Sequence, residues 1–170
     1  EMAKFPHRFT SKLEITFGQE LHLVLSMKNT DDEAFYVDEA LHSYFNVSDV
    51  REIYVHGLDG AKELDTVRDT QGVHEGPLTF TNGRVDSIFD TSNGSIIEDP
   101  GFKRRIIIEK EHSASTIVWN PAESKAADMH HEDWKHFVCV EVGNVRRNAL
   151  LLRPGQSHWM SLTIKVEELA

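Results

Sequence analysis

Apolar and polar residues alternate along much of this chain, which predicts strands rather than helices. Leu13, Ile15 and Phe17 alternate with polar residues, and after Gly18-Gln19 the alternation continues from Leu21 to Met27. Successive side chains of a strand point to opposite faces, so a period of two is typical of a half-buried strand. The two segments therefore predict a hairpin.

Further short strands are expected along the rest of the chain. The segment from Ala34 to Val47 carries aromatic and β-branched residues that suit a pleated sheet. The other expected strands are Glu52 to Val55, Leu78 to Thr81, Ser87 to Phe89, Ser95 to Ile97, Arg105 to Glu109, Thr116 to Trp119, Phe137 to Val142 and Trp159 to Val166. Turns rich in Gly, Asn and Pro separate them, which is typical of a β-sandwich or barrel.

Helix is expected only from Glu123 to Met129, where two turns at most would fit. Because strands and helices do not alternate, the pattern argues against a doubly wound nucleotide-binding fold. A length of 170 residues fits one domain, so we expect residues 1–170 to form a single β-sandwich. The strand that begins by Phe9 has no cap before it, which leaves a long sheet edge open unless something covers it.

Charge and composition exclude several classes of partner. The chain carries 18 Lys and Arg against 28 Asp and Glu, a net charge of -10, which opposes binding to nucleic acid. No apolar stretch approaches the length of a membrane span, and the segment from Glu1 to Phe9 does not resemble a signal peptide. A single cysteine, Cys139, cannot form an intramolecular disulfide. We therefore expect a cytoplasmic protein that binds neither nucleic acid nor membrane; the oligomeric state stays open.

The ten histidines predict no metal site. His130 and His131 are adjacent and cannot both easily face one tetrahedral zinc ion, and Cys139 has no companion at a ligand spacing. The remaining histidines, apart from His42, are expected to be structural or solvated: His7, His22, His56, His74, His112, His136 and His158.

Two ionisable residues lie inside apolar strand patterns, where burial without a role costs free energy. His42 lies in the segment from Ala40 to Val47, and it is either a hydrogen-bonded core histidine or a residue with a chemical role. Glu141 lies in the run from Phe137 to Val142, where desolvation would raise its pKa toward that of a general base. The alternative is a Glu that faces solvent from an edge strand. Cys139 shares the face of Glu141 and fits a small core residue better than a nucleophile.

Two other segments combine polar and aromatic residues. Trp119, Asn120 and Pro121 end a strand, and they suit either a platform for a sugar or a capped strand end. Asp86 precedes a short hydrophobic strand, where its carboxylate could bind ligand hydroxyls or form a local turn.

These segments, in this order, resemble the glucose-6-phosphate 1-epimerase branch of the aldose 1-epimerase (galactose mutarotase-like) superfamily. The similarity covers nearly the whole chain. The segments that carry it are Phe5-Pro6-His7 to Phe9, Ala40 to Val50, Gly57-Leu58 with Asp65, Val85 to Phe89, Val118 to Pro121, Phe137 to Glu141 and Leu152 to Gly155.

The resemblance implies an all-β supersandwich that interconverts the α and β anomers of an aldohexose, with glucose 6-phosphate as the expected substrate. It implies that Glu141 is the general base at the anomeric hydroxyl and that His42 is the general acid at the ring oxygen. The two are expected to straddle one pyranose ring. Asp86 corresponds to a ligand of substrate hydroxyls, and Trp119 and Asn120 are expected to contact the sugar. Neither a metal nor an organic cofactor is implied.

The resemblance also implies that this chain corresponds to the C-terminal portion of such a protein. Family members have an N-terminal portion before Phe5 that carries the basic residues expected to hold the phosphate, so we expect a truncated form. In this chain, Arg104-Arg105 and Arg146-Arg147 are expected to be solvated rather than to clamp a phosphate. A non-catalytic sugar-binding or interaction module is the alternative function. An immunoglobulin-like binding sandwich is disfavoured, since it gives a buried polar pair no role.

Overall fold

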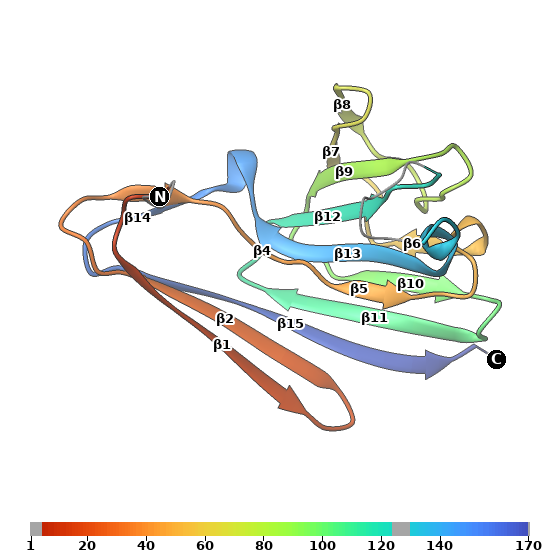
Figure 1. Ribbon diagram of the computed structural model, residues 1–170, viewed down its shortest axis with the longest axis horizontal. Helices are drawn as coiled ribbons and strands as arrows, with labels where there is room; N and C mark the ends of the chain where they lie inside the picture. Colours follow the sequence, from red (N-terminus) through yellow and green to blue (C-terminus); the bar gives the residue numbers. More distant parts are fainter. Residues whose placement is uncertain (1–4, 124–129, 170) are drawn as a thin grey trace.

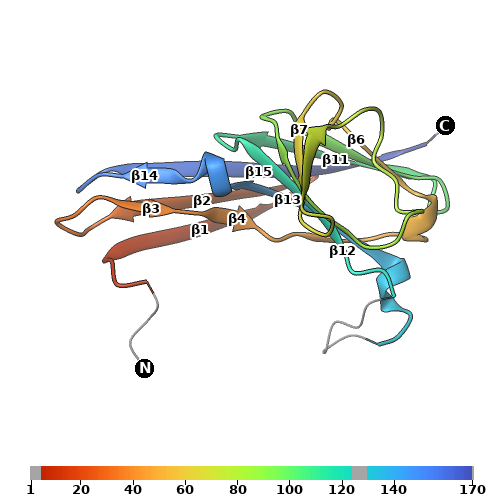
Figure 2. The ribbon, with the colours of Figure 1, turned by 90° about the horizontal axis from the view of Figure 1, so that it is seen from above.

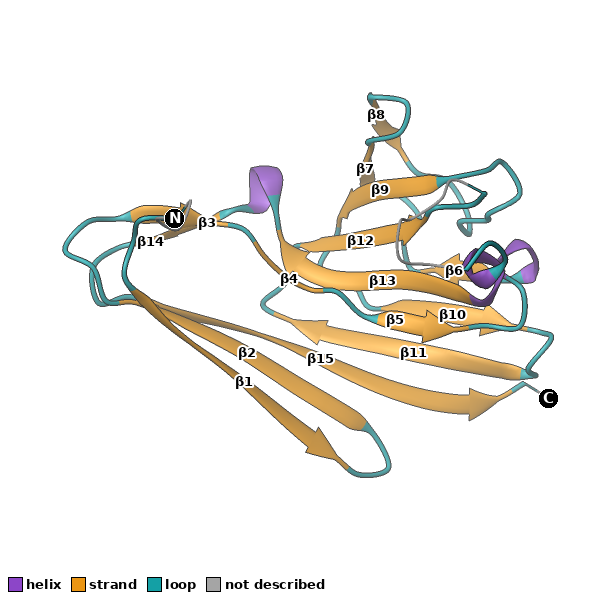
Figure 3. Ribbon diagram, viewed as in Figure 1, coloured by secondary structure: helices purple, strands orange, loops and turns teal. Residues whose placement is uncertain are grey.

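Strands joined by turns make up nearly all of the computed structural model, which describes residues 5–123 and 130–169 (Figures 1 and 3). The strands are β1 (Phe9–Phe17), β2 (Leu21–Asn29), β3 (Phe35–Val37), β4 (Glu39–Leu41), β5 (Tyr44–Asn46), β6 (Tyr54–His56), β7 (Lys62–Asp65), β8 (Thr70–Val73), β9 (Val85–Asp90), β10 (Ser95–Asp99), β11 (Arg104–Glu111), β12 (Ser115–Asn120), β13 (Phe137–Asn144), β14 (Leu150–Leu152) and β15 (Ser157–Glu168). Three short 3₁₀ helices accompany them: η1 (Val50–Glu52), η2 (Asp133–His136) and η3 (Arg146–Asn148). The helix expected from Glu123 to Met129 falls mainly on residues 124–129, outside the described residues.

Two antiparallel sheets form the body of the molecule. In the described residues, one sheet has six strands in the order β1-β2-β15-β11-β10-β6. The other has the order β4-β13-β12-β9-β7-β8, with β5 also paired to β13. Strands β3 and β14 form a small separate pair. The predicted hairpin is confirmed as β1 and β2, and Figure 2 shows β1 at the border of its sheet.

The main hydrophobic core lies between the two sheets. Val138, Val140 and Val142 of β13 point into it, together with Val118 of β12 and Phe89 of β9. Because side chains alternate along a strand, the odd-numbered residues of β13 lie on the opposite face of the sheet. Glu141 is therefore on the outer face, away from the core.

Some expected strands differ from the observed ones. The segment from Ala34 to Val47 contains three short strands, β3, β4 and β5, rather than one. The strand expected from Leu78 to Thr81 is wrong, because only Leu78 pairs, through an isolated bridge to Val55. Strands β7 and β8 were missed, since their sequences, Lys-Glu-Leu-Asp and Thr-Gln-Gly-Val, lack apolar alternation. In the described part of the chain, no helix is long and apolar enough to cross a membrane.

Candidate active site

Strand register brings His42 and Glu141 together. Leu41 of β4 pairs with Val142 of β13, and Tyr44 of β5 pairs with Cys139. Both strands pair with β13 in the same register. Continued across the connection between β4 and β5, this register places His42 opposite Glu141. Residues directly opposite in antiparallel strands have their Cβ atoms close together. Strand β13 has neighbours on both sides, so the edge-strand alternative for Glu141 is wrong.

The two side chains touch but differ in exposure. Nε2 of His42 lies 3.3 Å from Oε1 of Glu141. The His42 side chain is 52% exposed, whereas that of Glu141 is 8% exposed. The expectation that the pair straddles a pyranose ring is therefore wrong, because a contact of this length leaves no room for a ring between the two groups.

The buried position changes the acidity of Glu141. Desolvation raises the pKa of this carboxyl to about 7, and the negative charge of Asp86 adds to the rise. Burial, assisted by the charge of Glu141, also raises the pKa of the Cys139 thiol well above its usual range. Cys139 is fully buried on the outer face of β13 and suits a small packing residue rather than a nucleophile, because a thiol held in its neutral form is a poor nucleophile.

Aromatic rings surround this pair on the same face of the sheet. His42 stacks on Tyr44 with ring centroids 4.9 Å apart and an interplanar angle of 14°. Trp119 meets His42 edge to face at 6.2 Å and lies 5.7 Å from the ring of Phe137. Tyr44 and Trp119 are both paired with Cys139, one from each neighbouring strand, so their rings flank it. The rings of Tyr44, Trp119 and Phe137 thus form one cluster with the imidazole of His42.

Asp86 extends the same face by one strand. It pairs with Trp119 in the ladder between β9 and β12 and accepts a hydrogen bond from Nη2 of Arg84 at 2.8 Å. Its side chain is partly exposed, so its oxygens are within reach of a ligand on this face.

Asn120 does not join this cluster. Its amide nitrogen donates to the carbonyl oxygens of Trp134, at 2.8 Å, and Phe137, at 2.9 Å. Its side-chain oxygen accepts the backbone N–H of Ala122 at 2.9 Å. The side chain is buried and its hydrogen bonds hold the chain that enters β13, which corresponds to the capped-strand alternative rather than to a sugar contact.

A cavity of about 310 Å³ lies farther along the same face of the sheet. Leu64 and Ile88 line it. Ile88 of β9 is paired with Ile117 of β12, which is paired in turn with Glu141 of β13. Arg146 and Arg147 also line it; both are exposed, and Arg147 forms an ion pair with Asp90. The cavity adds positive charge near one end of the face that carries Glu141.

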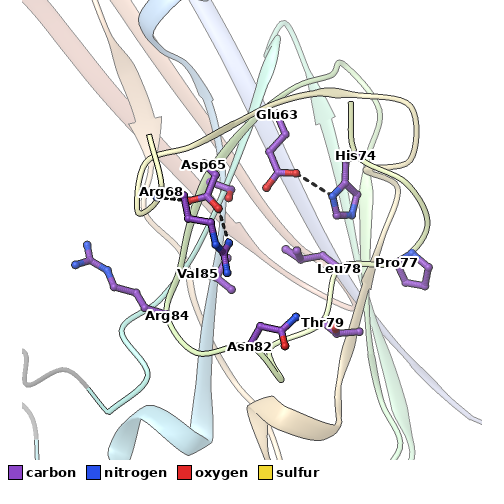
Figure 4. A pocket seen from close by; sticks show the side chains of 11 residues that line it. Glu63, Asp65, Arg68, His74, Pro77, Leu78, Thr79, Asn82, Arg84 and Val85 are labelled. Carbon is purple, nitrogen blue, oxygen red and sulfur yellow. Dashed lines mark hydrogen bonds and ion pairs between the residues drawn. The ribbon is translucent and has the colours of Figure 1, made fainter. Parts of the chain in front are cut away.

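A second cavity, of about 210 Å³, lies on the other side of β9 (Figure 4). Figure 4 shows two pairs among its charged side chains, Glu63 with His74 and Asp65 with Arg68, whereas Arg84, which also lines the cavity, contacts Asp86 instead. His74 Nδ1 lies 3.1 Å from Glu63 Oε2, and Arg68 donates to Asp65. At Asp65, desolvation is outweighed by hydrogen bonds from Arg68 and Val67, which lower the pKa of this carboxyl, whereas the pKa of Glu141 is raised to about 7. Among residues 5–123 and 130–169, no group of three or more His, Cys, Asp or Glu side chains could hold a metal ion.

Two residues beside this pair and Asp86, namely Tyr44 and Arg84, were not predicted from the sequence. Each lies two positions from a residue that the sequence singled out, His42 and Asp86. Because residues two apart share a face of a strand, this spacing was the available signal.

Comparisons with known proteins agree with this architecture. The sequence model of the family described as "Aldose 1-epimerase" matches residues 1–165. The chain is 30% identical over 161 residues to a protein of Cenchrus ciliaris named "Putative glucose-6-phosphate 1-epimerase", covering 89% of this chain and 49% of that protein. It is 29% identical over 165 residues to a protein of the same name from Escherichia coli K12, covering 93% of this chain and 54% of that one. The chain thus spans about half the length of the curated relatives that it matches.

Solved structures show the same fold. A crystal structure titled as a putative mutarotase from Salmonella typhimurium superposes with a TM-score of 0.86 at 29% identity, covering 97% of this chain and 56% of that one. A galactose mutarotase-like protein from Clostridium acetobutylicum gives a TM-score of 0.74 at 18% identity, covering 97% and 58%. The expected galactose mutarotase-like, all-β fold is confirmed.

Proposed function

Since the chain belongs to the aldose 1-epimerase family, we propose that His42 and Glu141 are the proton-transfer pair of a site that interconverts the α and β anomers of an aldohexose. The observation that carries this proposal is the contact between His42 Nε2 and Glu141 Oε1, made by a carboxyl with a pKa raised to about 7. A base poised near neutral pH can accept a proton and return it.

The proposed reaction moves two protons between neighbouring oxygens. The Glu141 carboxylate takes the proton of the anomeric hydroxyl, while the protonated imidazole of His42 gives a proton to the ring oxygen. The bond from the anomeric carbon to the ring oxygen breaks and the anomeric oxygen becomes an aldehyde. Rotation about the C1–C2 bond presents the other face of the aldehyde, and closure returns both protons.

The close spacing of the pair suits this chemistry. The anomeric oxygen and the ring oxygen are bonded to the same carbon, so the base and the acid must act at adjacent atoms rather than on opposite sides of a ring. Side chains that touch can each reach one of these oxygens.

Neighbouring residues support a sugar as the ligand. Trp119 and Tyr44 offer aromatic faces beside the pair, against which the C–H groups of a pyranose can pack. Asp86 offers carboxylate oxygens to sugar hydroxyls, with Arg84 holding one of them in place. The names of the relatives support glucose 6-phosphate as the hexose.

The test is the rate of anomer exchange in glucose 6-phosphate and glucose, measured by NMR exchange spectroscopy with a protein-free blank. Glu141→Gln and His42→Asn should each lower the catalysed rate by about 10²- to 10⁴-fold while the fold is retained. A matched control exists in the other sheet, where His56 Nε2 lies 3.3 Å from Glu98 Oε2. Glu98→Gln and His56→Asn should leave the rate unchanged.

Two outcomes would contradict the proposal. Equal losses in the site variants and the control variants would show that the rate does not depend on this pair. Sugar binding without any catalysed exchange would instead support a non-catalytic sugar-binding module with the same fold.

A further inference from the structure

His42 lies at a break in the ladder beside β13. Strand β4 ends at Leu41 and β5 begins at Tyr44, and both strands pair with β13. Between them, the backbone N–H of Ser43 donates to the carbonyl oxygen of Leu41 at 3.0 Å, which closes a γ-turn with His42 at its centre. A residue at the centre of such a turn is held less firmly by the ladder than a strand residue is. The direction of the His42 imidazole therefore depends on side-chain contacts.

A stacked ring fixes the plane of this imidazole. The rings of Tyr44 and His42 have centroids 4.9 Å apart and an interplanar angle of 14°, which is an offset stack. The torsion that turns a histidine ring about its Cβ–Cγ bond is soft, so an unsupported imidazole takes a broad range of orientations. A parallel neighbour narrows this range, because rotation would drive the edge of the imidazole into the Tyr44 ring. The stack thus sets the plane in which Nε2 points to Oε1 of Glu141, 3.3 Å away.

The Tyr44 ring is itself supported by the sheet. Tyr44 is paired with Cys139, which is fully buried in β13. The centroid of its ring lies 5.4 Å from that of Phe137, with a tilt of 45°, and 6.4 Å from that of Trp119, with an angle of 81°. Trp119 also meets the imidazole edge to face. A chain of ring contacts therefore connects the sheet to His42.

A second histidine–carboxylate pair shows that this stack is not a general result of the sequence spacing. In the other sheet, His56 Nε2 lies 3.3 Å from Glu98 Oε2, and Tyr54 is two residues from His56 in the same strand, β6. Tyr44 is likewise two residues from His42. The ring centroids of Tyr54 and His56, however, lie 6.3 Å apart, and the rings are tilted by 36°. The parallel stack is therefore a particular feature of the candidate active site.

We propose that Tyr44 is a positioning residue, whose ring holds the His42 imidazole so that Nε2 stays against the carboxyl of Glu141. The inference rests on the proposed function, since it assigns Tyr44 a part in the same proton transfer. Catalytic groups must be held in a productive geometry, and a displacement of about 1 Å can cost about 10²-fold in rate. Tyr44 acts through His42 and not on the reacting atoms. This role uses the ring face that lies against the imidazole, and it is separate from contact with the sugar.

Two substitutions of Tyr44 separate the ring from the hydroxyl group. Tyr44→Phe keeps the ring, so kcat for anomer exchange should stay within about threefold of the wild-type value. Tyr44→Leu removes the ring, and kcat should fall by about 10- to 10²-fold while KM changes by less than about threefold. A ring that only binds the sugar would give the opposite result, a raised KM with kcat unchanged. Tyr44→Val, which suits a strand, replaces Tyr44→Leu if that variant does not fold.

A spectroscopic readout tests the stack without turnover. Protons that lie over the face of an aromatic ring resonate upfield, so the imidazole protons of His42 should carry an upfield shift from Tyr44. Tyr44→Leu should remove this shift, and Tyr44→Phe should keep it. The His42 resonances are assigned by their loss in His42→Asn. Tyr54→Leu is the matched control, and it should change neither these resonances nor kcat.

Failure of this inference and failure of the proposed function give different results. If His42→Asn lowers the rate but Tyr44→Leu leaves either kcat or the His42 resonances unchanged, the positioning role is overturned and the proposed function stands. Equal losses of kcat in Tyr44→Phe and Tyr44→Leu would also overturn it, because the effect would then belong to the hydroxyl group. A rate that does not change in His42→Asn would contradict the proposed function and this role of Tyr44 together. Circular dichroism and the melting temperature confirm that each variant is folded.

Discussion

Nε2 of His42, in the connection between β4 and β5, lies 3.3 Å from Oε1 of Glu141 in β13. The contact unites an exposed imidazole with a buried carboxyl. Because the carboxyl is desolvated and lies near Asp86, its proton is retained up to about pH 7. The same arrangement therefore has consequences for stability and for activity, and these can be measured separately.

Glu141→Gln should change how stability depends on pH. The folded state raises the pKa of Glu141 from 4.5 to about 7, so between these values the folded chain binds more protons than the unfolded chain. Stability from this residue is present below pH 4.5 and is lost as pH rises to about 7. After allowance for solvent screening, Glu141→Gln should therefore be more stable than wild type above pH 7 by about 1–2 kcal/mol.

Urea unfolding at pH 5 and pH 8 measures this difference. Glu98→Gln is the matched control, since Glu98 also lies beside a histidine but its side chain is 28% exposed. Glu98→Gln should be no more stable than wild type at pH 8. If Glu141→Gln were less stable than wild type at pH 8, the charged carboxylate would be a stabilising group and the desolvation argument would fail.

The anomerisation rate should also follow the titration of Glu141. A general base must be deprotonated to accept a proton, so kcat/KM should fall as pH decreases through about 7. His42→Asn should lower the rate at every pH, but kcat/KM of this variant should still fall as pH decreases through about 7. Initial rates by NMR exchange between pH 5 and pH 9 provide the profile. A rate that is flat through pH 7 would rule out Glu141 as the base.

Asn120→Ala should destabilise the protein through lost backbone support. Two carbonyl oxygens and one N–H group that now bond to this buried amide would lose their partner, which costs about 1–3 kcal/mol. Asn46→Ala is the control, because Asn46 is exposed and its amide makes a single hydrogen bond, to the carbonyl oxygen of His136 at 3.1 Å. Equal losses in urea unfolding for the two variants would contradict a structural role for Asn120.

Local sequence patterns predict which residues share a face but not which strands become neighbours. Alternation along β13 sets Glu141 and Cys139 on one face and the valines on the other, as the structure has them. The contact between His42 and Glu141 depends on the pairing of β4 and β5 with β13, and the pairing register of distant strands is decided by tertiary packing. The sequence therefore identifies both residues without showing that they touch.

The hydrogen bonds of Asn120 and the existence of strand β8 could not be predicted from the sequence, for related reasons. Asn120 follows Trp119 directly, so it points to the other face of the sheet, where its partners come from residues 134 and 137. Strand β8 has four exposed residues and, within residues 5–123 and 130–169, pairs only with β7, so its sequence carries no burial pattern to detect. In both cases the deciding interactions come from outside the segment.

The arginines expected to be solvated are mostly engaged with acidic or carbonyl groups. Arg104 donates to the carbonyl oxygen of Asn46 at 2.6 Å, and Arg105 lies 3.6 Å from Glu98. Arg147 is paired with Asp90 at the cavity beside Ile88. A cation that already faces an anion attracts a second anion weakly.

The 170-residue chain should therefore bind glucose 6-phosphate no better than glucose. Its net charge of -10 repels a dianion, and only a local cluster of free cations would reverse that repulsion. Calorimetric titration of both sugars at low salt should give dissociation constants within about threefold of each other. Arg146→Gln is the informative variant, because Arg146 is exposed and lines the cavity on the face of Glu141. A clear preference for the phosphate that disappears in Arg146→Gln would contradict the prediction and would locate an anion site at that cavity.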